Sequence, residues 1–108
     1  MLVLFDQGTP KPLGAYLKGH TVKTAREQGW SALSNGELLS AAEAAGFEVL
    51  VTTDKQLPFQ QNLDKRKIAV VVLGNAQWPA LRLYADRVVV AVNAAVAGSC
   101  MEVEIPTK

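Results

Sequence analysis

Three acidic residues occupy positions from which their side chains could meet in the folded chain. Asp6 follows an apolar run at residues 2–5, Asp54 follows another at residues 49–52, and Glu37 lies at the start of a helical pattern over residues 35–45. In open parallel α/β sheets, ligands bind outside the carboxyl ends of the strands. We therefore expect these carboxylates to converge at that edge, where they would repel one another unless a cation lies between them.

A site made only of carboxylate oxygens indicates which cation it would take. Oxygen ligands without histidine or cysteine suit Mg²⁺ or Mn²⁺, which keep coordinated water and bind substrate phosphate. Such an ion can activate a water molecule and hold a phosphate for hydrolysis. The three acids are thus candidate catalytic and metal-binding residues.

Each acid also has a purely structural explanation. Asp6 could form an Asx turn with Gly8, and Asp54 could cap the short helix that follows it. Glu37 lies three residues after Ser34, the spacing of a capping box in which each side chain bonds the other's backbone amide. Spacing alone does not separate these alternatives from a metal site.

Several polar residues near the acids could bind phosphate or orient the carboxylates. Asn35, Gln61 and Asn62 could hydrogen-bond RNA or the carboxylates, and Lys55 could contact a phosphate. The basic triplet 65–67 could also meet phosphates, although such a run is more often a solvated turn. His20 is expected in a loop, and Cys100 is expected to be buried.

The predicted elements alternate between strands and helices. Strands are expected at residues 2–5, 21–24, 49–52, 68–73 and 101–105, the last as a half-exposed edge strand and 68–73 as the central one. Helices are expected from Pro10, capped by Thr9, to about residue 18, then over 35–45, from 55 or 58 to 63, over 78–83 and over 85–96. This order predicts an α/β fold, a three-layer α/β/α sandwich with a mainly parallel sheet of about five strands.

Length and composition narrow the class of protein. The 108 residues suit a single domain over 1–108, and 49% hydrophobic with 19% charged residues excludes a disordered chain. The net charge of +1 gives no strong attraction to nucleic acid or membrane. One cysteine and one histidine exclude an internal disulfide and a zinc site built from those two alone. Without a recognisable signal peptide or membrane span, we expect a cytoplasmic protein.

The same segments resemble the PIN-like domains, in particular a small, uncharacterised bacterial branch related to toxin ribonucleases. The matching segments cover nearly the whole chain and are LFDQGTP at 4–10, NGELLSAAEAAGF at 35–47, VLVTTD at 49–54, QQN at 60–62 and IAVVVL at 68–73. The resemblance implies a Mg²⁺- or Mn²⁺-dependent ribonuclease, with Asp6, Glu37 and Asp54 holding the ion. It further implies RNA as substrate, a small antitoxin protein as partner in a toxin–antitoxin pair, and a homodimer.

Departures from the family pattern favour an alternative function. Many relatives have acids where this chain has Asn35 and Gln56, and the usual fourth acid is replaced by Asn75 or absent. The alternative is a catalytically degenerate PIN-like module that binds RNA or a protein partner. A phosphoryl-acceptor receiver domain, with Asp54 as acceptor, is disfavoured because Gln7 follows Asp6 and no lysine follows the last strand until Lys108.

Overall fold

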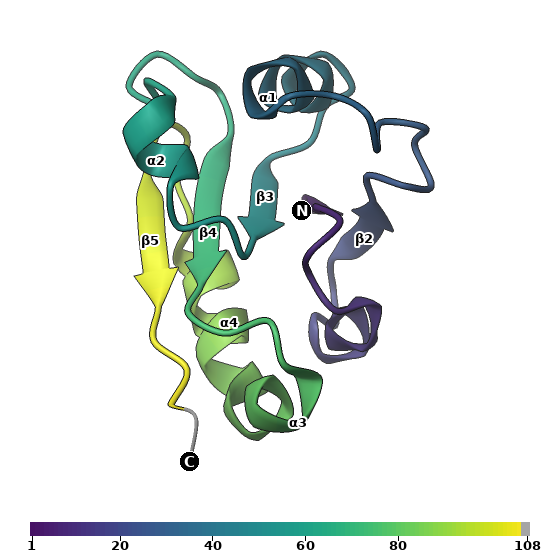
Figure 1. The fold of residues 1–108 in the computed structure, drawn as a ribbon, viewed down its shortest axis with the longest axis vertical. Coiled ribbons are helices and arrows are strands. Elements are labelled where there is room, and N and C mark those ends of the chain that lie inside the picture. Colours follow the sequence, from purple (N-terminus) through teal and green to yellow (C-terminus); the bar gives the residue numbers. More distant parts are fainter. Residues whose placement is uncertain (107–108) are drawn as a thin grey trace.

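The computed structural model describes residues 1–106 and contains one sheet of five strands, all parallel. The strands are β1 (Leu2–Phe5), β2 (Thr21–Thr24), β3 (Val49–Thr52), β4 (Ala69–Leu73) and β5 (Cys100–Val103). Their order across the sheet is β2-β1-β3-β4-β5 (Figure 1), which makes β3 the central strand rather than β4 as predicted. The predicted α/β class with a parallel sheet is confirmed.

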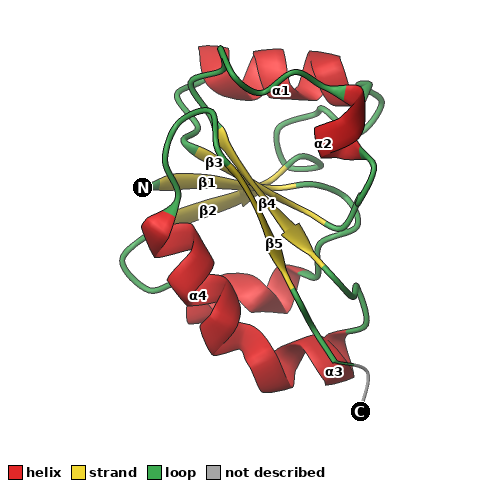
Figure 2. Cartoon of the chain, turned by 90° about the vertical axis from the view of Figure 1, so that its left-hand side faces the viewer, coloured by secondary structure: helices red, strands yellow, loops and turns green. Residues whose placement is uncertain are grey.

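Helices cover both faces of this sheet. They are η1 (Lys11–Tyr16), α1 (Asn35–Ala44), α2 (Leu57–Gln60), α3 (Trp78–Leu81), η2 (Arg82–Tyr84) and α4 (Ala85–Ala94). Figure 2 shows α1 and α2 on one side of the strands and α3 and α4 on the other. None of the helices in the described part of the chain is long and apolar enough to cross a membrane.

Two hydrophobic cores lie between these layers, because successive residues of a buried strand point to opposite faces. On β1, Val3 and Phe5 belong to the core under α4, whereas Leu4 belongs to the core under α1. The inner strands are therefore continuous apolar runs, which is typical of parallel strands that are covered on both sides. This sandwich fixes the strand ends that carry the acidic residues.

The connections on the β4 side of the sheet cross on different faces. The β3–β4 connection contains α2 and packs against the α1 core, whereas the β4–β5 connection contains α4 and packs against the other core. Both connections move in the same direction across the parallel sheet, but they cross on opposite faces of it. The two crossovers are therefore of opposite handedness. The helix α4 contacts β4 and β5, and it also contacts η1 on the same face of the sheet.

Three local expectations need correction. The segment after Pro10 is a six-residue 3-10 helix, not a helix to residue 18, and Thr9 does not cap it. Gly14 lies in the middle of the segment and is a weak helix former, so the sequence does not favour a long α-helix there. Cys100 is exposed rather than buried, because it lies on the edge strand β5.

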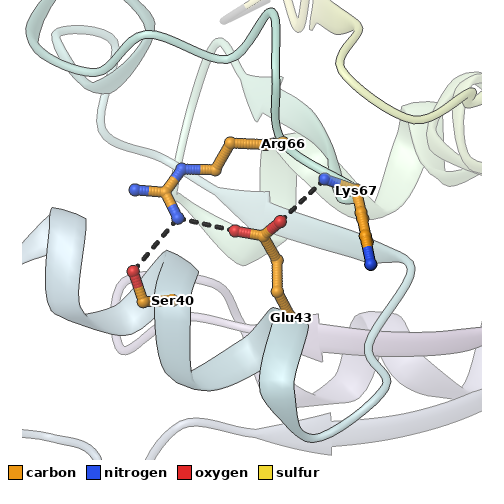
Figure 3. Close-up of polar contacts among 4 residues, drawn as sticks. All are labelled: Ser40, Glu43, Arg66 and Lys67. Carbon is orange, nitrogen blue, oxygen red and sulfur yellow. Dashed lines mark hydrogen bonds and ion pairs between the residues drawn. The ribbon is translucent and has the colours of Figure 1, made fainter.

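A polar cluster joins α1 to the loop before β4 (Figure 3). Arg66 Nη1 donates to Glu43 Oε1 at 2.6 Å and to Ser40 Oγ at 3.1 Å, and the Lys67 backbone N–H donates to Glu43 Oε2 at 2.7 Å. Although burial opposes ionisation, these donors hold the pKa of Glu43 below its ordinary value. The central residue of the basic triplet 65–67 is therefore part of an internal ion pair.

Candidate functional site

Asp6 lies directly after β1, where its carboxylate receives three hydrogen bonds. Oδ1 accepts from the Gly8 backbone N–H at 3.1 Å and from Thr9 Oγ1 at 3.1 Å, and Oδ2 accepts from Thr52 Oγ1. The bond from Gly8 is the Asx turn expected as the structural alternative for Asp6. The Thr9 hydroxyl also lies 2.9 Å from the Val51 carbonyl, so its single proton is shared between Asp6 and β3, which ties this loop to that strand.

The electrostatic state of Asp6 favours a nearby cation. Burial raises the pKa of Asp6 above its ordinary value of 3.8, and the negative charge of Asp54 raises it further. The hydrogen bonds from Thr52, Thr9 and Gly8 act against this but do not cancel it. Positive charge beside Asp6 would stabilise the ionised carboxylate.

Asp54 follows the neighbouring strand β3 and is also held from both sides. Its Oδ1 accepts from the Gln56 backbone N–H at 2.9 Å, and its Oδ2 accepts from Asn35 Nδ2 at 2.9 Å. Asp54 is not the cap of α2, because that helix begins at Leu57 with Gln56 as its N-cap residue. Asp54 nevertheless makes a local bond to Gln56 in the turn that leads into α2, and Asn35 holds its other carboxylate oxygen.

The Thr52 hydroxyl links the two acids. It donates to Asp6 Oδ2 and accepts from the Asp54 backbone N–H at 3.0 Å, and the residue is fully buried at the end of β3. Because β1 and β3 are adjacent in the sheet, the two carboxylates lie at the same edge. This edge lies between β1 and β3, where the strand order reverses and open α/β sheets bind ligands.

Gly8 allows the two loops to approach closely. A Cβ atom at this position would lie 2.4 Å from Thr53 Oγ1, well inside van der Waals contact. Sequence reasoning missed Thr9, Thr52 and the role of this glycine. The available signal is a threonine, Thr52, at the end of the otherwise apolar strand β3, because a buried hydroxyl needs a polar partner.

Glu37 does not join the other two acids. Its Oε1 accepts from the Ser34 backbone N–H at 2.9 Å, and Ser34 Oγ accepts from the Glu37 N–H at 3.3 Å, which forms the expected capping box. The hydrogen bonds from Ser34 lower the pKa of Glu37. Among residues 1–106, no three His, Cys, Asp or Glu side chains are grouped to hold a metal ion, so the predicted convergence of three carboxylates is not found.

The remaining predicted site residues are divided between the site and other surfaces. Asn35 contacts Asp54, and the Gln61 side chain packs beside Gly36 at the start of α1. Asn62 accepts from the Asp64 backbone N–H at 3.0 Å in a local turn. Lys55 is exposed and lines a pocket with Glu102 on the β5 side rather than with Asp6.

A pocket of about 950 Å³ opens beside Asp6, on the side of β1 that faces β2. It is formed by the loops that follow these two strands, and its lining residues are Asp6, Gln7, Gly8, Thr9, Pro10, Lys11, Thr24, Arg26 and Glu27. Asp6 therefore lines the pocket and also belongs to the carboxylate pair with Asp54. A ligand in the pocket would reach the carboxylate edge.

The donor set fits a hard divalent cation with few protein ligands. Of the four carboxylate oxygens of Asp6 and Asp54, only Asp6 Oδ1 accepts two hydrogen bonds, and the other three each accept one. Each of these three oxygens keeps a lone pair that could bind a metal. Mg²⁺ is commonly held by one or two carboxylates, with water and substrate phosphate completing its shell.

No match to this chain was found among protein-family models, curated proteins or solved structures. The resemblance to PIN-like domains stays a prediction from the sequence.

Proposed function

We propose that this chain is a PIN-like, Mg²⁺- or Mn²⁺-dependent ribonuclease that hydrolyses RNA phosphodiesters. The observation that carries this proposal is the pair of carboxylates Asp6 and Asp54, which the buried Thr52 hydroxyl holds at one sheet edge. Two carboxylates with open lone pairs suit an ion that must leave room for water and phosphate.

The side chains divide the work of such a site. Asp6 and Asp54 bind the ion, Thr52 and Thr9 orient Asp6, and Asn35 orients Asp54. When bound, the ion would lower the pKa of a coordinated water molecule and act as a Lewis acid toward the phosphate. Glu37 would become a ligand, or orient the attacking water, only by leaving its helix cap.

The proposed cellular location and partners follow from the family resemblance and from one feature of the sheet. We propose a cytoplasmic protein whose partners are RNA, a small antitoxin protein and a second copy of the chain. The edge strand β5 supports the last of these, because it pairs on one side only and Met101 on it is exposed.

The test of this proposal is RNA cleavage by the intact chain. We expect cleavage of single-stranded RNA with Mn²⁺ or Mg²⁺, none with EDTA, and none by Asp6→Asn or Asp54→Asn. Asp64→Asn is the matched control, because Asp64 lies in an exposed loop away from the pair. Metal-dependent cleavage that persists in both site variants would point to a contaminating nuclease and refute the proposed mechanism.

One observation favours the second candidate, a module that binds RNA or protein without catalysis. The third carboxylate, Glu37, is engaged in the capping box of α1. Glu37→Gln tests whether the third carboxylate is needed for cleavage, because glutamine at this position preserves the capping box. Full activity in Glu37→Gln means that two carboxylates suffice, whereas an inactive wild-type chain that still binds RNA favours the module.

A further inference from the structure

The pocket beside Asp6 is lined by two positively charged residues that have no role in the proposed metal site. Lys11 follows the β1 loop and Arg26 follows β2, so two cations from different loops line the same cavity. Both residues are exposed, and within residues 1–106 the one ion pair of Lys11 is a 3.9 Å contact with Glu27. An ion pair this exposed is worth little, so a phosphate can compete for the lysine.

Glu27 is fixed independently of Lys11. Its Oε1 accepts from the Thr24 backbone N–H at 2.9 Å, and its own N–H donates to Thr24 Oγ1 at 3.1 Å. These hydrogen bonds from Thr24 hold the pKa of Glu27 below its ordinary value, so it is a permanent anion at neutral pH. Lys11 and Arg26 therefore line the same pocket as Glu27 and Asp6, and the formal charges of the four residues balance.

This balance changes when a divalent cation binds at Asp6. The ion adds two positive charges beside the pocket and leaves Lys11 and Arg26 available for anions. At about 950 Å³ the pocket lies at the upper end of the roughly 300–1,000 Å³ typical of ligand sites. Because the pocket begins at Asp6, a chain of phosphates can extend from an ion at Asp6 into the pocket.

We infer that this pocket binds the phosphate backbone of single-stranded RNA next to the scissile phosphate, with Lys11 and Arg26 as its phosphate ligands. The inference rests on the proposed function for its choice of ligand. No aromatic ring is among the pocket residues in the described part of the chain, so bases have no stacking platform there. Binding is therefore expected to be independent of RNA sequence.

The experiment measures fluorescence anisotropy of labelled oligo(U) and oligo(A) RNA with the full chain. Ca²⁺ replaces the catalytic ion, because it takes oxygen ligands at longer distances, and a denaturing gel checks that the RNA stays intact. Lys11→Gln and Arg26→Gln should each weaken binding about fivefold and lower the slope of log affinity against log salt by about 0.7. EDTA should weaken wild-type binding.

Lys65→Gln and Arg82→Gln are the matched controls, since each removes one exposed positive charge outside the pocket. Lys65 precedes β4 and so lies at the opposite, amino-terminal edge of the parallel sheet. Equal losses in the controls and the pocket variants would overturn the inference, as would unchanged binding in both pocket variants or no binding by the wild type.

The outcome is distinguishable from failure of the nuclease proposal. RNA binding that depends on Lys11 and Arg26, in a chain that cleaves no RNA, supports the pocket and refutes the nuclease. Metal-dependent cleavage with unchanged RNA affinity in both pocket variants supports the nuclease and refutes the pocket.

Discussion

The Thr52 hydroxyl is the residue-level feature on which the site depends most directly. It serves the carboxylate of Asp6 and the backbone of Asp54 at once, from a fully buried position. Groups that orient metal ligands in this way typically change metal affinity about 10- to 100-fold when they are removed. In the proposed metal site, Thr52 would therefore be a positioning residue that does not itself touch substrate.

Thr52→Val tests this role, because valine keeps the shape of threonine and removes the hydroxyl. We expect Mn²⁺ affinity to fall about tenfold or more, and the free energy of unfolding to fall by about 1–3 kcal/mol, since the Asp54 N–H loses its partner. Thr52→Ser keeps the hydroxyl and should retain Mn²⁺ affinity within about threefold. Calorimetry and urea denaturation measure the two effects, and equal Mn²⁺ affinity in valine and serine variants contradicts the role.

At this scale the sequence predicted some of the site and missed the rest. Asp6 and Asp54 could be predicted because each follows an apolar strand, which places it at the carboxyl edge of the sheet. Thr52 ends an otherwise apolar buried strand, which indicates that its hydroxyl has a polar partner, but the sequence does not say that this partner is Asp6, 46 positions away. The contact of Thr9 with the Val51 carbonyl joins distant segments and has no local pattern either. The position of Glu37 was consistent with a metal ligand and with a capping box, and the structure shows the capping box.

At the scale of elements, the ion pair between α1 and the loop before β4 stabilises the layer that carries Asn35. Glu43 and Arg66 are only 19% and 21% exposed, so solvent screens their 2.6 Å contact less than it would a surface pair. Glu43 also accepts from the Lys67 backbone N–H. Loss of the carboxylate charge would weaken both contacts.

Glu43→Gln should lower the free energy of unfolding by about 1–2 kcal/mol at pH 7. The folded-state pKa of Glu43 lies below its ordinary value of 4.5, so the carboxylate stabilises the fold above pH 4.5 and loses this contribution as the pH falls through the folded pKa. The difference between wild type and Glu43→Gln should therefore shrink in acid.

Urea denaturation at pH 7 and below pH 4.5 measures this difference. Glu104→Gln is the control, because Glu104 is exposed on the edge after β5, and it should change stability by less than about 0.5 kcal/mol. A Glu43→Gln chain as stable as wild type at pH 7 contradicts the role assigned to the pair.

The elements themselves were largely predictable. The valines of residues 85–96 have strand propensity, yet their helical spacing indicated a helix, and α4 buries Ala85, Val88 and Val92 as that spacing requires. The segment after Pro10 was predicted wrongly, because the cap pattern of Thr9 and Pro10 does not take account of Gly14, a weak helix former in the middle of the segment. Thr9 also bonds Asp6 and Val51 instead of the helix.

At the scale of the whole molecule, the strand order makes the site. Asp6 and Asp54 are 48 positions apart in the chain and share one edge because β1 and β3 are neighbours. Apolar periodicity predicts that strands exist and that they are buried, but it does not determine which strands pair. The sequence therefore predicted the parallel sheet and the edge at which Asp6 and Asp54 lie, while the central strand and the pocket between β1 and β2 required the structure.

Titration calorimetry with Mn²⁺ tests the central claim most directly. The chains compared are the wild type, Asp6→Asn, Asp54→Asn and the control Asp64→Asn, with folding checked by circular dichroism. The carboxylate pair predicts one site in the wild type and in Asp64→Asn, and no binding at millimolar ion in the other two folded variants. A wild type that binds no ion at millimolar concentration, or site variants that bind as tightly as the wild type, would contradict the account.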